Sequence, residues 1–268
     1  MRKPLVAVLA TAALALAAWS EPNVARAIYS GTCNTGPTHV YKNWTSMQKS
    51  VPSHTVSGAL GDVDVRALAP CTQNGPIWDQ SFVLITIQRD GVAFETDIVQ
   101  IGYARCGQSG GCNGIPSDGK QHFWYTKDDD ASGTAYLADG WYKAPILGHR
   151  YRMKVEATTH SGDSVWQYCI RDLTLAAGYV CHFEPRTWTN GVFAWWGTEV
   201  TNDRSQNGTR AIDPDIALEG QYKSSGSWFI RSGADNDCFR TTAYFYPTYY
   251  SCLVTNNDKQ LWSYTFDH

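Results

Sequence analysis

Two short segments place a polar side chain among apolar and aromatic neighbours. Gln100 interrupts the apolar run Ile98–Tyr103 (IVQIGY), and Glu199 follows a pair of tryptophans in Phe193–Val200 (FAWWGTEV). A buried primary amide without hydrogen-bond partners costs roughly 1–3 kcal/mol, so Gln100 is either tied into a local network or faces a ligand. A carboxylate beside aromatic rings is partly desolvated, which is the environment of a general acid or base. Gln100 and Glu199 are therefore the first candidates for chemistry.

Both segments have the composition of β-strands, in which every second residue shares a face. On that reading Gln100 lies on one face with Gly102, and Glu199 lies on one face with Trp195 and Gly197. Glycine leaves open space and allows a ligand or another backbone to approach closely. The two strands thus predict two polar side chains beside open space.

Other patterns are open to a chemical or a structural interpretation. Glu95 and Asp97 would share a strand face, as paired carboxylates do in glycoside hydrolases, or would simply end a solvated strand. The run 128–130 (DDD) could bind calcium or form an acidic turn. Ser46 and Lys49 match Ser-x-x-Lys, which we ascribe to chance because its partner motifs are missing. The seven histidines are dispersed, with no two at metal-ligand spacing, so we expect no metal and no cofactor.

The elements that would position these residues read mainly as strands. Tyr151, Met153 and Val155 alternate with charged residues, which predicts one buried and one wet face. Asp90-Gly91 is a hairpin signal, and the only helix that we expect is short, around Val40–Lys49. The pattern predicts an all-β fold, an antiparallel two-sheet sandwich of the jelly-roll or concanavalin-like type. The expected strands are 82–88, 93–103, 122–126, 151–157, 165–170, 179–183, 192–200, 228–231, 238–246, 250–254 and 261–266.

Residues 1–27 read as a secretory signal peptide. Arg2 and Lys3 precede the apolar run Leu5–Ala18, which is shorter than the ~20 residues of a membrane span, and Ala25–Ala27 has the pattern of a cleavage site. We therefore expect a secreted, extracellular protein. Residues 28–75 are expected to form an N-terminal disulfide-tied segment, and residues 76–268 a β-sandwich domain; the polar run 201–214 is a second possible boundary or a long loop.

An even number of cysteines in an exported chain favours disulfides. Sequential pairing is the simplest arrangement, although the sequence does not determine connectivity. It would join Cys33 to Cys71, Cys106 to Cys112, Cys169 to Cys181, and Cys238 to Cys252.

The charge distribution limits the classes of partner. The formal net charge is −3 and no basic stripe is present, which argues against nucleic-acid binding. No later segment is apolar enough to span a membrane, and we expect a monomer. Asn43 and Asn207 head formal N-glycosylation motifs.

The order of these features resembles that of the glutamic peptidases called eqolisins and of their neprosin-like relatives, over residues 82–203. Gln100 stands in the apolar-Gln-x-Gly context of the eqolisin glutamine, and Glu199 matches the neprosin-like Trp-Gly-Gly-Glu-Val stretch. The aromatic strand 122–126 resembles the one that follows the first catalytic residue in both families. This chain departs from the neprosin-like pattern in having glutamine at the first site and Thr198 in place of glycine.

The resemblance implies a secreted β-sandwich endopeptidase that is active at acid pH on a polypeptide substrate. Glu199 would be the general base and acid, and the Gln100 amide would stabilise the oxyanion. Tyr103, Trp124, Trp195 and Trp196 would line the substrate site. The eleven tryptophans also allow a non-catalytic alternative, a lectin-like carbohydrate-binding module for an extracellular glycan or a cell-surface interaction module.

Overall fold

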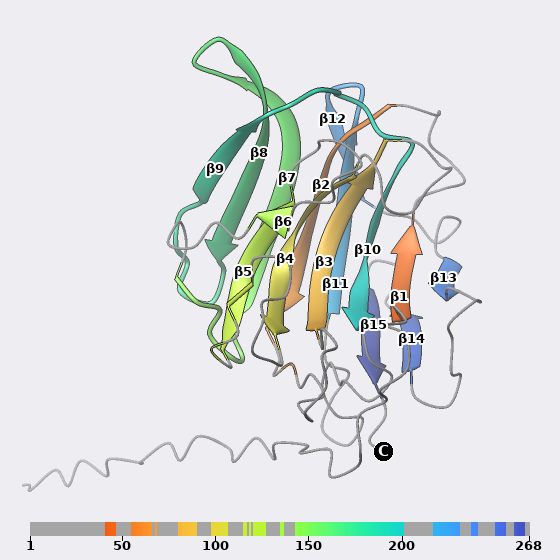
Figure 1. Cartoon of the computed structure of the whole chain (residues 1–268). Coiled ribbons are helices and arrows are strands. Elements are labelled where there is room, and N and C mark those ends of the chain that lie inside the picture. The colour runs from red at the N-terminus through yellow and green to blue at the C-terminus, as the bar shows by residue number, and fades with distance from the viewer. Residues whose placement is uncertain are drawn as a thin grey trace, which may run out of the picture.

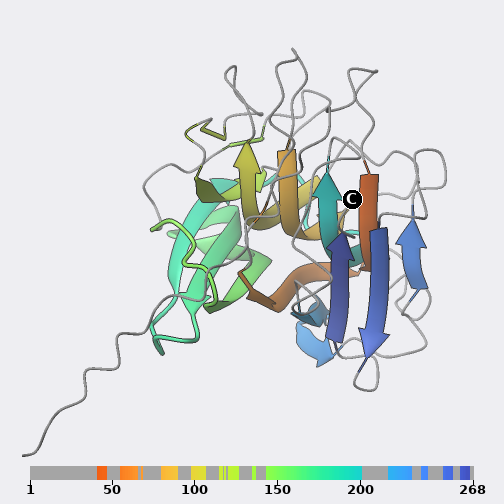
Figure 2. The same ribbon diagram turned by 90° about the horizontal axis from the view of Figure 1, so that it is seen from below.

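The chain folds into two antiparallel β-sheets packed face to face (Figures 1 and 2). The structure is a computed structural model, and it describes residues 41–46, 55–65, 68, 80–89, 98–106, 115–116, 118, 120–126, 135–136, 143–200, 217–230, 237–240, 250–255 and 260–265. All regular elements in these ranges are strands. The described residues include no helix that is long and apolar enough to cross a membrane. The two-layer, all-β expectation is confirmed.

The front sheet of Figure 1 has the order β13-β1-β10-β3-β4-β5-β6. Its strands are β1 (Tyr41–Ser46), β3 (Gln80–Gln88), β4 (Ile98–Cys106), β5 (Gln121–Thr126), β6 (Ala135–Tyr136), β10 (Phe193–Val200) and β13 (Asp237–Arg240).

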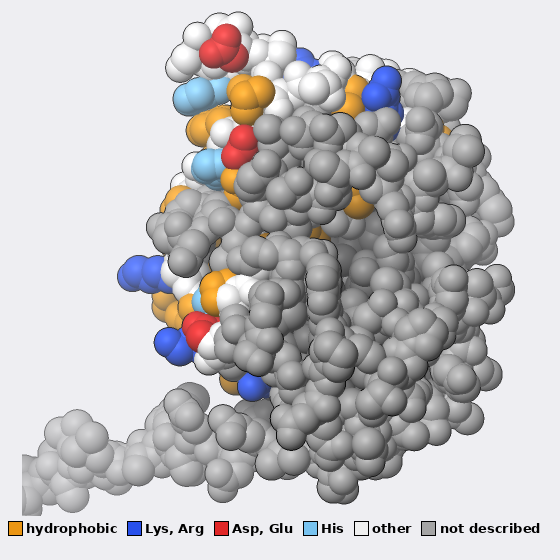
Figure 3. Space-filling model, viewed as in Figure 1, with side chains coloured by type: hydrophobic (Ala, Val, Ile, Leu, Met, Phe, Trp, Pro, Cys, Tyr) orange, Lys and Arg blue, Asp and Glu red, His pale blue; other side chains and the backbone are white. Residues whose placement is uncertain are grey.

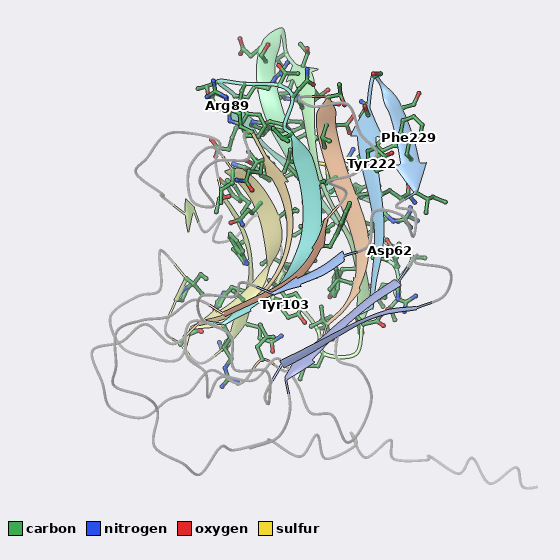
Figure 4. The ribbon with its side chains drawn as sticks, turned by 90° about the vertical axis from the view of Figure 1, so that its right-hand side faces the viewer. Asp62, Arg89, Tyr103, Tyr222 and Phe229 are labelled. Atoms are coloured by element: carbon green, nitrogen blue, oxygen red, sulfur yellow. A yellow bond between two sulfur atoms is a disulfide. The ribbon has the colours of Figure 1, made fainter. Side chains whose placement is uncertain are left out.

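The back sheet has the order β14-β15-β11-β2-β7-β8-β9, with β12 paired to β11. Its strands are β2 (Val56–Asp64), β7 (Arg150–His160), β8 (Asp163–Asp172), β9 (Val180–Pro185), β11 (Ala217–Ser224), β12 (Ser227–Ile230), β14 (Tyr250–Thr255) and β15 (Gln260–Thr265). Viewed from the side in Figure 4, both sheets bend in the same sense, so that the outer face of the front sheet is concave.

The N-terminal part of the chain differs from expectation in two ways. The expected helix at Val40–Lys49 is wrong, because residues 41–46 form β1 between β10 and β13. The aromatic and β-branched residues of this segment suit a strand. Pairing with a strand on each edge favours the extended conformation over the helix. In addition, β1 and β2 belong to the two sheets, so the sandwich draws on the chain before residue 76.

The core lies between the sheets and consists of every second residue of the central strands. On β7, Tyr151, Met153 and Val155 are buried and the alternate residues are more exposed, as the sequence predicts. Hydrogen bonds between the layers include one from Trp196 Nε1 to the Leu60 carbonyl at 2.9 Å and one from the Tyr168 hydroxyl to the Thr126 carbonyl at 2.6 Å.

A backbone contact and a disulfide fix the margins of the sandwich. Val56 and Gly191 exchange backbone hydrogen bonds of 3.1 and 2.7 Å, which link the start of β2 to the segment that leads into β10. Cys169 and Cys181 stand directly opposite on β8 and β9 and form a disulfide, so this expected pair is confirmed. The other three expected pairs involve side chains outside the described residues.

Candidate functional site

The register of the front sheet assembles the candidate residues into rows on its outer face. Directly opposed residues in an antiparallel pair point to the same face. Gln100 stands opposite Thr86 and Thr126, and Thr86 stands opposite Trp195. Val99 and Ile101 belong to the core, so the Gln100 row faces away from it.

Gln100 is buried even though its row faces outward. Its exposed fraction is 6 %, and Trp124, Ala104 and Gly102 on the same face are buried as well. The sequence expectation of a buried amide within an apolar strand is met. Burial on the outer, concave face gives this amide a different setting from that of a core residue.

The two glycines singled out in the sequence fall in one row. Gly102 and Gly197 both stand opposite Leu84, one on each side of it, and the row continues to Trp124 on β5 and through Trp44 on β1 to Phe239 on β13. Each of the two glycines therefore lies between two large residues in the row next to that of Gln100.

Glu199 stands on the same outer face, two strands away from Gln100. It lies opposite Phe82 on β3 and Lys42 on β1, and Phe82 lies opposite Ala104 on β4. The offset between the Glu199 and Gln100 rows is four residues, which corresponds to about 13 Å along the strands and about 10 Å across them on a flat sheet. The side chains of Glu199 and Trp195 lie outside the described residues.

Two of the expected substrate contacts lie on the other side of the sheet. Tyr103 and Trp196 are fully buried members of the core between the sheets. Residues an odd number of positions apart on a strand point to opposite faces. Tyr103 therefore points away from the face of Gln100 on β4, and Trp196 points away from the face of Glu199 on β10. Neither contributes to a site on the outer face.

Among the remaining sequence candidates, those that the structure describes are not brought together into a second site. Glu95, Asp97 and residues 128–130 lie outside the described residues. Ser46 belongs to strand β1 rather than to the helix that a Ser-x-x-Lys nucleophile requires. Four of the five tryptophans whose side chains are described are buried, so they offer no stacking platform for a glycan. The four are Trp124, Trp166, Trp188 and Trp196.

Charged groups pair across the back sheet. Arg152 and Arg150 form two-pronged ion pairs with Asp62 and Asp64, and Figure 4 labels Asp62 on β2. Near the end of β8, Asp172 is buried, and burial by itself raises the pKa of its carboxyl. Hydrogen bonds from the His149 ring at 2.8 Å and from the Leu175 amide outweigh that effect, and the pKa of Asp172 lies below its ordinary value of 3.8.

One polar cluster was missed by the sequence analysis. Tyr125 on β5 meets His182 and Glu184 of β9 at the edge of the sandwich. The signal in the sequence was weak, because only His182 and Glu184 are close together along the chain and the phenol comes from the other sheet.

Solved structures include a chain that is similar to this one. The chain is similar to SCP-B, a member of the eqolisin family of peptidases, solved in complex with the tripeptide Ala-Ile-His. The two are 14 % identical, the alignment covers 85 % of this chain and 97 % of that chain, and the TM-score is 0.48. At this TM-score the likeness carries no argument about the fold or the site. No protein-family model and no curated protein matches the chain.

Proposed function

We propose that this protein is a secreted glutamic-peptidase-like endopeptidase, active at acid pH, with Gln100 and Glu199 as its catalytic pair. The observation that carries the proposal is the buried amide of Gln100 on the outer, concave face of the front sheet. The register position of Glu199 on the same face and the sequence context of both residues support it. The Cys169–Cys181 disulfide agrees with an oxidising compartment.

The proposed reaction needs only water and a peptide bond. Glu199 takes a proton from the water that attacks the scissile carbonyl and later gives this proton to the leaving amine. The Gln100 amide donates a hydrogen bond to the oxygen of the tetrahedral intermediate, where negative charge develops. A buried amide is suited to this role because its dipole is held in place before the substrate arrives.

Lys42 has a defined part in the proposal, since its position is opposite Glu199. A lysine at that register position favours the ionised carboxylate, which is the form that accepts a proton. Replacing Lys42 by alanine is expected to move the acid limb of the pH–rate profile toward higher pH. An unmoved limb would remove Lys42 from the mechanism.

The test is a casein digest followed by mass spectrometry between pH 2 and 6. Glu199→Gln is expected to abolish the cleavage products of the wild type. Glu219→Gln makes the same substitution on β11 of the back sheet and is the matched control that should retain them. Identical products from Glu199→Gln and wild type would exclude the proposed role of Glu199.

A further inference from the structure

Two arginines on the outer face of the back sheet are bound by carboxylates of the chain itself. Arg150 donates from Nε and Nη2 to the two carboxylate oxygens of Asp64, at 2.6 and 2.9 Å. Arg152 donates in the same way to Asp62, at 2.5 and 2.6 Å. Two parallel hydrogen bonds from one guanidinium to one carboxylate make a strong and directional ion pair. Arginine on this face of the sheet thus binds the carboxylate of aspartate.

A third arginine on the same face has no such partner. Arg171 on β8 stands directly opposite Arg152 on β7. Within the described part of the chain, no group accepts a hydrogen bond from Arg171 or forms an ion pair with it, and its Nε is buried without a partner. A partly desolvated charge without an acceptor costs free energy. The Nη groups of this guanidinium are not buried, so an external acceptor can reach them and offset that cost.

Tyr179 brings a second cation next to Arg171. It directly precedes Val180, the residue of β9 that stands opposite Ile170, so it comes beside Arg171 at the edge of the sheet. The centroid of the Tyr179 ring lies 5.8 Å from Arg171 Cζ and 5.7 Å from Lys154 Nζ, within the range of cation–π contacts. We call Arg171, Lys154 and Tyr179 the cationic patch. It lies on the opposite side of the sandwich from Gln100.

The cationic patch carries more positive charge than its neighbours neutralise. Glu156 accepts a hydrogen bond from Lys154 at 2.8 Å and another from Lys223, and Asp62 neutralises Arg152. Among the described side chains in the cross-strand rows of Arg152, Lys154 and Glu156, four cations therefore face two carboxylates. The whole chain has a formal net charge of −3, so attraction of an anion to this place is local rather than general.

The cationic patch is open to solvent at its edge. Tyr179 and Val180 each expose 43 % of their surface. In Figure 3, Lys and Arg atoms lie along the left margin of the molecule, below the place where Figure 1 draws β9, and the outer face of the back sheet is turned away from the viewer. A ligand can therefore reach the charged groups and contact apolar surface beside them.

We propose that the cationic patch binds a carboxylate side chain of an acidic polypeptide. The Nη groups of Arg171 donate two parallel hydrogen bonds to the carboxylate, and Lys154 adds positive charge beside it. A polypeptide is the favoured source because Arg150 and Arg152 bind aspartate carboxylates on the same face. The exposed apolar surface of Tyr179 and Val180 suits the side chains that flank an acidic residue.

The test is fluorescence anisotropy of a fluorescein-labelled hexaglutamate peptide that is titrated with the full chain at pH 7 and low ionic strength. We expect saturable binding that weakens as salt is added, and no binding of labelled hexaglutamine. Arg171→Gln should weaken binding about tenfold or more, because the two charge-assisted hydrogen bonds are lost. Arg171→Lys keeps the charge but not the paired donors, and should also weaken binding.

Arg186→Gln is the matched control. Arg186 Nε is likewise buried without a partner, but this arginine donates to the Thr189 hydroxyl and follows the last residue of β9. The control removes the same charge and should bind hexaglutamate as the wild type does.

Two results would overturn the proposal: no binding by the folded wild type at low ionic strength, and binding that Arg171→Gln leaves unchanged. Stronger competition by an oligogalacturonate of equal charge than by unlabelled hexaglutamate would overturn the assignment to a polypeptide. If circular dichroism shows that Arg171→Gln does not fold, Lys154→Gln decides, with weaker binding expected and unchanged binding against the proposal.

Discussion

Replacing Trp196 by phenylalanine should destabilise the sandwich measurably. The side chain is fully buried, and its indole nitrogen donates across the core to the Leu60 carbonyl at 2.9 Å. Losing that hydrogen bond costs about 1 kcal/mol. Losing roughly 40 Å³ of packed volume costs about 1 kcal/mol more, at ~24 cal/mol per Å³ of cavity. We therefore expect the free energy of unfolding to fall by about 2 kcal/mol.

The site cannot easily collapse around the smaller ring. Gly220 on the back sheet lies against the indole, and a Cβ added there would stand 3.0–3.3 Å from three of its atoms. Urea unfolding measures the change, as a lower midpoint with an unchanged slope. Trp228→Phe, on the partly exposed β12, is the control and should change the unfolding free energy by only about 0.5 kcal/mol. Equal effects of the two substitutions would show that the buried Trp196 and its hydrogen bond to Leu60 do not contribute the expected stability.

Three further predictions concern the margins and the acid behaviour of the fold. Gly191→Ala should destabilise strongly, because the new Cβ would stand 2.6 Å from Ile87 Cγ2, whereas Gly178→Ala, with no atom within 4 Å, should be nearly neutral in the same urea assay. Replacing Cys169 and Cys181 by alanine should cost about 3 kcal/mol in unfolding free energy, and a peptide map without reductant should contain their cross-linked peptide. The lowered pKa of Asp172 contributes stability above about pH 4, and this stability is lost as the pH falls. Asp172→Asn should therefore flatten the pH dependence of the melting temperature between roughly pH 5 and 3. An unchanged slope would contradict this.

The strands of the sandwich were readable from the sequence because local composition and alternation agree with the fold. Residues 151–157 and 165–170 were expected and lie within β7 and β8. The segment 40–49 failed because its ten residues fit either a helical or an extended pattern. Pairing with β10 and β13, which the sequence does not reveal, decides for a strand.

The candidate site was readable to the extent that alternation alone determines it. Alternation predicted that Gln100 shares a face with Gly102, and Glu199 with Gly197, and the sheet register adds that all four share one face. The same alternation places Tyr103 and Trp196 in the core, although their aromatic character suits a substrate contact. The contact of Tyr125 with His182 and Glu184 could not be foreseen, because Tyr125 reaches His182 only through the packing of one sheet on the other.

The most direct test of the central claim is a double-mutant cycle on kcat/KM for an acid-cleaved peptide. Gln100→Ala is expected to lose about 10²–10³-fold and Glu199→Gln about 10²–10⁴-fold. If both residues act on the same transition state, the double variant should be little worse than the Glu199 variant alone. Losses that multiply independently, or activity that survives both substitutions, would contradict a Gln100–Glu199 catalytic pair.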